Sequence, residues 1–352
     1  MARFAERANA VASNLGKGTN DYTRAALIYA QQGLGQKEIE EKTAITLKTA
    51  NVTGQSAEEV SEELTAVWNG YKVSADEAEL YIDRLAAVAS TTASNLQELS
   101  TGMSKVASAA ATLGVGEEQL AAQLSTIISV TRQAPETVGT ALRTVYARIT
   151  DIQAGLDEDG VTLGKYSGDM AKIGINVLDL NGNLRNMGEV MEEIGNKWST
   201  MTQEQKIYLA QTMAGQRQYS NLMALFDNFD KYKSALNTAQ NAEGKLQEQQ
   251  DVYMDRLSTH VQQLTTATEH MWMGLTDTDG FKDIIDGLTT IVEKVDKLFQ
   301  SIGGGKNLLQ SLVPIVMSLT SKTVASGINT MIMNSQLEKR QLRDQRSSQV
   351  LA

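Results

Sequence analysis

The sequence predicts an all-α protein: an array of short helices followed by a longer antiparallel helical hairpin, with one small β-hairpin insertion. The first observation is that 352 residues include only two prolines, where ordinary usage of about 5% would give about eighteen. Aromatic residues are also few, with 5 Phe, 3 Trp and 10 Tyr, whereas helix formers such as Ala, Leu, Gln and Glu are abundant. The 27 glycines are close to ordinary usage, so we expect separate helices rather than one continuous rod.

Short helices are expected throughout residues 1–154, because helix-start signals recur there. In a capping box, a Ser or Thr side chain bonds the backbone N–H three residues on, and a Glu or Gln at that position bonds back. Gly116, which precedes two acidic residues, and Pro135 suit the first turns of two more helices. The pairs that fit the capping box are Ser56 with Glu59, Ser74 with Glu77, Ser94 with Gln97 and, further along, Thr202 with Gln205.

Apolar stripes at helical spacing follow these starts. The intervals between successive starts drift, and the similarity between the units is low. The pattern therefore indicates a helical array and not a true repeat protein. The stripe that follows Ser74, for example, consists of Leu80, Ile82, Leu85 and Val88.

Residues 155–190 form a Gly-rich segment of different character. Within it, residues 175–187 alternate apolar and polar side chains around Asn181-Gly182, which is a strong short-range signal for a β-hairpin. A lone two-stranded hairpin is not stable in water. We therefore expect a small β-hairpin that lies against helices and is the one clear piece of β-structure in the chain.

Residues 191–302 are expected to be a helical core with a corner at Gly215. The first helix of the corner ends at Ala214, and Gly215 suits the position that closes a helix. For Arg217 we favour a side chain that bonds the carbonyls at the end of the preceding helix over an anion-binding site. The buried stripe of the next helix consists of Leu222, Leu225, Phe226 and Phe229.

The helical core ends in a long antiparallel helical hairpin. Its first helix runs from about residue 242 to 275, a turn follows at 276–280, and its second helix continues to residue 302. Apolar residues in 281–302 recur at three- and four-residue steps, and a second apolar row lies beside them. Packing of the two helices within one chain is the simpler reading of this pattern.

The second apolar row leaves surface exposed after the two helices have closed, and such a surface usually meets a partner. We therefore expect a small parallel oligomer, a trimer, in which each chain presents this face. The candidate oligomer interface consists of Phe281, Ile285, Leu288, Val292, Val295 and Phe299.

Residues 303–352 begin with a joint of three glycines, continue with an apolar stretch at 308–320 and end in a polar tail. A membrane span needs about 20 apolar residues, so a buried or interfacial helix is favoured. A membrane-active segment over residues 308–333, in contact with a host membrane, is the alternative. The tail stops without a terminating signal, which indicates a portion of a longer protein.

Catalytic and cofactor chemistry has little support in the sequence. The chain has no cysteine, which excludes a thiol nucleophile or a thiolate metal site. Its two histidines, His260 and His270, would point to different faces of one helix and cannot share a metal. Stretches 15–21 and 302–309 lack residues that a phosphate loop requires, and a calcium loop starting at Asp277 would lack its final Glu. We expect no enzyme, no metal and no cofactor.

The net charge limits the kinds of partner that we expect the chain to bind. The net charge of −10 argues against specific nucleic-acid binding, because proteins that bind the phosphate backbone carry clustered excess Lys and Arg. The first residues lack the apolar segment of a signal peptide.

Segments that follow one another from about residue 11 to residue 305 resemble, in the same order, the core region of phage tail tape measure proteins. The most specific pieces are residues 137–149, the Asn181-Gly182 hairpin and the corner at 215–219 that leads into "LMALFDN". The resemblance implies a non-enzymatic virion protein that occupies the lumen of the tail tube, sets tail length in assembly and is released ahead of the DNA during ejection. It also implies a location in the host cytoplasm during assembly.

The resemblance further implies several copies side by side in a narrow tube, and contacts with the tail tube protein, tail assembly chaperones and tail-tip or baseplate hub proteins. A helical ejection protein that permeabilises membranes or acts on the cell wall is the alternative. Cell-wall hydrolysis would need a catalytic constellation, and the sequence offers none.

Overall fold

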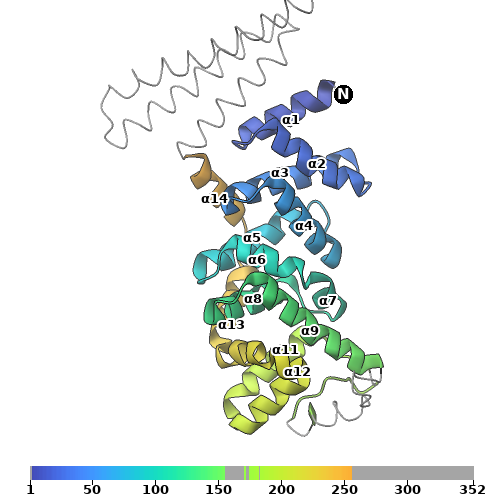
Figure 1. Cartoon of the computed structure of the whole chain (residues 1–352), viewed down its shortest axis with the longest axis vertical. Coiled ribbons are helices and arrows are strands. Elements are labelled where there is room, and N and C mark those ends of the chain that lie inside the picture. Colours follow the sequence, from blue (N-terminus) through green and yellow to red (C-terminus); the bar gives the residue numbers. More distant parts are fainter. Residues whose placement is uncertain (1, 155–169, 172–173, 182, 256–352) are drawn as a thin grey trace, which may run out of the picture. The chain divides into compact units, whose positions relative to one another are not determined.

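A computed structural model describes residues 2–154, 170–171, 174–181 and 183–255, and this part of the chain is all-α, as the sequence predicts. The described helices belong to one compact unit, Met1–Thr259, in which short helices follow one another through tight turns (Figure 1). The helices are α1 Ala2–Asn14, α2 Thr19–Gln31, α3 Gln36–Thr53, α4 Ala57–Tyr71, α5 Ala78–Thr91, α6 Leu96–Ser104, α7 Ala107–Thr112, α8 Glu117–Thr131, α9 Pro135–Ala154, α11 Met187–Lys197, the 3-10 helix η1 Trp198–Thr200, α12 Gln203–Asp227, α13 Phe229–Gln240 and α14 Lys245–Met254.

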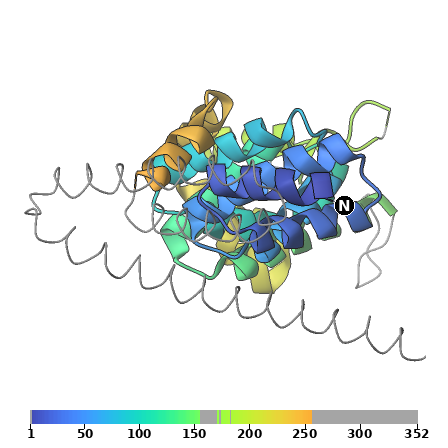
Figure 2. The same ribbon diagram turned by 90° about the horizontal axis from the view of Figure 1, so that it is seen from above.

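Most early helices pack on helices close to them in sequence. Helix α2 lies on α3 and α4, α4 lies on α6 and α7, and α6 lies on α9. Their buried faces join one apolar core that runs from Tyr29 in α2 to Leu246 in α14. A smaller apolar cluster around Tyr22 and Leu47 attaches α1, and the view from above shows α1 and α2 lying over the later helices (Figure 2).

Four predicted helix starts are confirmed. Ser56 caps α4: its hydroxyl accepts from the backbone N–H of Glu59, and the Glu59 carboxylate accepts from the backbone N–H of Ser56. Thr202 caps α12 in the same way, with its partner three residues on. Gly116 directly precedes α8, and Pro135 is the first residue of α9. Local sequence signals therefore decide where these helices begin.

The predicted capping box of Ser94 and Gln97 is wrong by one residue. Asn95 is the cap of α6: its side chain accepts from Glu98 N at 2.8 Å, and the Glu98 carboxylate accepts from Asn95 N at 2.9 Å. The Ser94 hydroxyl is instead buried, 2.8 Å from the hydroxyl of Thr92. Ser94 and Asn95 are both good capping residues. The Ser94 hydroxyl is hydrogen-bonded in the core, so Asn95 caps the helix instead.

The predicted start at Ser74 is also displaced. The carboxylate of Glu77 accepts from Ser74 N at 3.4 Å, which is one bond of a capping box, and it also accepts from the Ser74 hydroxyl at 2.8 Å. The residues between them form a turn, however, and α5 begins only at Ala78. The local hydrogen bond is therefore correct, and the helix it was expected to open starts one turn later.

The apolar stripe predicted for α5 is correct at three of its four positions. Ile82, Leu85 and Val88 are buried, but Leu80 is 39% exposed. Tyr81 is buried in its place, with its hydroxyl donating to the sulfur of Met103 at 3.3 Å. The stripe was assigned to Leu80 by hydrophobicity, whereas the register of the helix gives the core position to the tyrosine.

The two-stranded hairpin predicted for residues 175–187 is not confirmed. The segment contains one isolated antiparallel bridge, between Leu178 and Leu184, and no strand among its described residues. The carboxylate of Asp179 accepts from the backbone of Asn181 and Asn183, both at 2.8 Å, and so supports a turn. The turn was predicted correctly, and a paired ladder on either side of it is not shown.

The corner predicted at Gly215 is confirmed as a kink inside α12. Gly215 has φ 70° and ψ 170° between two helical stretches. This conformation differs from the left-handed helical one expected of a closing glycine, and it is more strongly restricted to glycine. Of the stripe expected after the kink, Leu222, Leu225 and Phe226 lie in α12, whereas Phe229 begins α13; all four are buried.

The second half of the described chain returns along the array. Helix α13 packs on α8 and α5, and α14 packs on α3 and α5, so the last described helices lie beside helices of the first half (Figure 1). We call residues 229–254 the return arm. The helix expected from about residue 242 to 275 begins at Lys245 and, as α14, ends at Met254; residues 256–275 of that prediction lie outside the described residues. So do the turn at 276–280, the second helix of the hairpin, the apolar stretch at 308–320 and the polar tail.

Candidate interaction site

The docking surface of α14 is the most elaborate polar contact between distant parts of the described chain. Asp83 of α5 is 5% exposed, and its carboxylate accepts two backbone hydrogen bonds, from Gly244 N at 2.8 Å and from Leu246 N at 2.7 Å. Helix α14 has no side-chain cap of its own, so Asp83 supplies the cap from another helix. The first turn of α14 is thereby fixed to α5.

The surroundings of Asp83 act on its pKa in opposite directions. Burial raises the pKa of Asp83 above its usual value, although the hydrogen bonds from Leu246 and Gly244 act in the opposite direction. The nearby pair of Lys48 and Glu79, 2.6 Å apart, contributes opposing influences on that pKa. The carboxylate thus combines a burial cost with a specific capping geometry.

Two buried amides form a second contact of α14. The side-chain nitrogen of Asn51 donates to the carbonyl of Leu15 at 2.7 Å and to the side-chain oxygen of Gln250 at 3.0 Å. The side-chain nitrogen of Gln250 donates to the same Leu15 carbonyl at 3.3 Å. Asn51 and Gln250 are 3% and 2% exposed, so the contact links α14, α3 and the end of α1 out of reach of bulk water.

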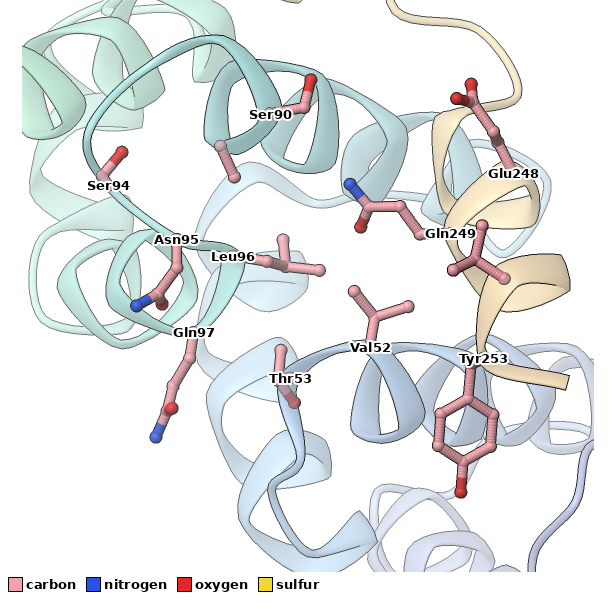
Figure 3. A pocket seen from close by; sticks show the side chains of 12 residues that line it. Val52, Thr53, Ser90, Ser94, Asn95, Leu96, Gln97, Glu248, Gln249 and Tyr253 are labelled. Carbon is pink, nitrogen blue, oxygen red and sulfur yellow. The ribbon is translucent and has the colours of Figure 1, made fainter. Parts of the chain in front are cut away.

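A hollow of about 490 Å³ lies beside the second half of α14. The side chains of Val52, Leu96 and Gln249 face it from three sides (Figure 3). The Gln249 side-chain nitrogen donates to the Ala86 carbonyl at 3.4 Å, while its oxygen has no hydrogen-bond partner among the described residues. We call this space the α14 hollow; it is lined by Val52, Thr53, Ala89, Ser90, Ser94, Asn95, Leu96, Gln97, Glu248, Gln249, Val252 and Tyr253.

The lining of the α14 hollow is mixed in character. Its described residues include hydroxyl, amide and apolar side chains with one carboxylate, Glu248, and none of them is a His, Lys or Cys. The Ser90 hydroxyl donates to the Ala87 carbonyl at 2.7 Å, so its proton is taken up by the backbone. In the described part of the chain, no group of three or more His, Asp or Glu side chains is placed to hold a metal ion.

The Gly215 corner is structural in its contacts. A Cβ placed on Gly215 would lie 3.4 Å from the guanidinium of Arg148, so the kink packs against α9. Arg217 is exposed and makes no hydrogen bond to the preceding helix within the described residues, which makes the capping role expected for it wrong. The arginine at the corner is Arg148, and no local sequence signal could have placed it there.

The candidate oligomer interface at Phe281, Ile285, Leu288, Val292, Val295 and Phe299 lies outside the described residues. The same holds for the alternative membrane contact at 308–333. Among the helices that the structure describes, none is long and apolar enough to cross a membrane.

The fold is that of an all-α protein of packed short helices. The docking contacts of α14 and the lining of the α14 hollow are suited to noncovalent contact. A family model, described as phage-related minor tail protein, matches residues 7–215, and the chain belongs to this family. The chain is therefore a structural, virion-associated protein that works in contact with other components of a phage tail. The match ends at the Gly215 kink, so the return arm lies beyond it. No solved structure matches the chain.

Proposed function

We propose that this chain is a folded segment of a tail tape measure protein. In this role it occupies the tail tube, sets tail length during assembly and leaves ahead of the DNA. The observation that carries the proposal is the family match over residues 7–215, which coincides with the helical array. The resemblance of residues 11–305 to tape measure proteins supports this particular role within the tail.

Helix geometry separates the array from the measuring part of such a protein. A helix rises about 1.5 Å per residue, so 352 residues in one helix would span roughly 530 Å. The described helices are instead 6 to 25 residues long and fold back on one another. We therefore assign length measurement to extended segments outside the array.

Tail length tests the proposal. An in-frame insertion of about 40 helix-forming residues within 334–352 should lengthen the tails of the engineered phage by roughly 60 Å, at about 1.5 Å per residue. A matched insertion into the exposed turn 179–183 adds a loop to a folded unit and should leave tail length unchanged. Tails of unaltered length from the first insertion would contradict the tape-measure role and leave the chain as another kind of tail component.

We also propose that copies of the chain associate as a trimer through the 281–302 face, because its apolar stripe is wider than pairing within one chain needs. The tail tube protein, assembly chaperones and the tail-tip or baseplate hub are the other proposed partners. Light scattering on the full chain should show a trimer that Val292→Asp dissociates. Gln300→Asp adds the same charge on the opposite face and should leave it intact. A monomer before any substitution would contradict the trimer.

The alternative, a protein that permeabilises membranes through residues 308–333, has its own readout. Leakage of dye from liposomes by the full chain, lost on deletion of residues 306–352, would favour it over a purely luminal role. We expect no leakage.

A further inference from the structure

We propose that α14 is a latch, which undocks from α3 and α5 as a unit while α13 and the array remain folded. The inference rests on the docking contacts of α14 and does not depend on the tape-measure role. Its consequence is that the attachment point of residues 256–352 can leave the array without unfolding it.

The apolar contribution to α14 docking is small. Of its ten residues only Leu246 and Gln250 are buried, and one of these two is polar. Helix α13, by contrast, has an apolar buried face from its first turn to its last, at Phe229, Tyr232, Ala235 and Ala239. Because burial of apolar surface is the main favourable term in packing, the two helices of the return arm are held by very different means.

Hydrogen bonds, rather than apolar packing, hold α14 in its docked position. Asp83 caps two backbone N–H groups, Asn51 and Gln250 share the Leu15 carbonyl, and Gln249 reaches the Ala86 carbonyl. Each of these groups can exchange its partner for water once α14 leaves, so the net stabilisation from each is modest. Their geometry still fixes one docked position. Helix α14 is therefore held weakly on α3 and α5 but in one defined position, as the proposed latch requires.

The connection to α13 permits the movement. Gly244 has φ 78°, and a Cβ built there would meet no atom within 4 Å, so this glycine faces open space while its backbone N–H is bound to Asp83. The second half of α14 borders the α14 hollow, where Val252 is 59% exposed. Helix α14 is thus fixed by its first turn and by Gln250, with open space beside its end and a glycine at its start.

A pull on residues 256–352 would load α14 first, because it is the last element of the described chain and the least supported by apolar contacts. Elements with few buried apolar contacts open at lower free energy than the core. Such an element can therefore separate without unfolding of the array behind it.

Hydrogen exchange on the full chain, followed by mass spectrometry, tests the latch. Peptides from α14 should exchange at least tenfold faster than those from α13, with a weaker dependence on denaturant than global unfolding. Asp83→Ala should accelerate α14 a further tenfold and leave α8 and α13 unchanged. Asp76→Ala, an exposed Asp on the preceding turn, is the matched control and should change nothing.

A reversible lock provides the second arm, which stays informative if Asp83→Ala fails to fold. The chain has no cysteine, so Asn51→Cys and Gln250→Cys would add its only two thiols, at side chains whose terminal atoms lie 3.0 Å apart. A short bifunctional reagent that joins the two thiols through reducible disulfide bonds should slow α14 exchange to the rate of α13, and reductant should restore it. Equal exchange of α13 and α14 in the unmodified chain, with the same denaturant dependence, would overturn the latch.

Discussion

Gly139 of α9 faces the backbone of Gly102 in α6 so closely that a Cβ on Gly139 would lie 2.3 Å from the Gly102 carbonyl oxygen. Two helices of the family-matched array therefore meet backbone to backbone, and both glycines are buried. Gly139→Ala should lower the free energy of unfolding by about 1–3 kcal/mol, because the neighbouring backbone must move apart. Urea denaturation of the full chain measures this.

The control for that substitution lies next to it. Thr140 is exposed on the same helix, and Thr140→Ala should change stability by less than about 0.5 kcal/mol. Equal stability of Gly139→Ala and the unmodified chain would mean that the α6–α9 contact is looser than described.

Gly215 should tolerate no side chain. Its φ of 70° and ψ of 170° lie in a region open essentially to glycine alone, so Gly215→Ala should cost about 1–3 kcal/mol of stability. Arg217→Ala, two residues on at an exposed position, should stay within about 0.5 kcal/mol and leave any ligand binding unchanged. A larger loss from Arg217→Ala than from Gly215→Ala would reverse the roles assigned to the two residues.

Asn95 should matter more than its neighbours at the start of α6. Asn95→Ala removes the side chain that accepts from Glu98 N and should lower the free energy of unfolding by about 1 kcal/mol. Gln97→Ala should have an effect below about 0.5 kcal/mol, because Gln97 is exposed and is not the capping partner. Thermal unfolding monitored by circular dichroism compares the two, and the opposite order would restore the original Ser94–Gln97 box.

The hydrogen bonds that Glu193 of α11 accepts from Arg185 and Lys197 should make the stability of the chain sensitive to acid. Hydrogen bonds from Lys197 and Arg185, at 2.8 and 2.9 Å, lower the pKa of Glu193 below its usual 4.5. A lowered folded-state pKa means that the stabilisation is present above pH 4.5 and is lost as the pH falls through the folded value. Glu193→Gln should therefore destabilise the chain at pH 7, and the difference should shrink below pH 4. Denaturation at both pH values checks this, and a difference that grows in acid would contradict it.

Local chemistry explains which parts of the fold the sequence could predict. Ser56 and Thr202 cap helices because the atoms they bond lie three residues away, and no distant contact competes. At Ser94 a distant contact does compete, since its hydroxyl is drawn into the core and Asn95 takes over the cap. Leu80 and Tyr81 differ in the same way, because packing and not hydrophobicity alone selects the buried side chain.

The candidate site could not be predicted from the sequence, for a related reason. Asp83 and Leu246 are 163 positions apart, and Asn51 and Gln250 are 199 apart. Neither pair belongs to a motif, and an isolated Asp on an apolar helix face reads as an ordinary surface residue. Only the return of α13 and α14 along the array brings them together.

Locating the chain in tails before and after ejection tests the central claim most directly. Cryo-electron microscopy of intact particles, with a density tag in the exposed turn 179–183, should place the chain inside the tail tube. The same density should be absent from tails that have ejected their DNA, while the tube itself is unchanged. A tag found on the outer surface, or retained in the tube after ejection, would contradict the account.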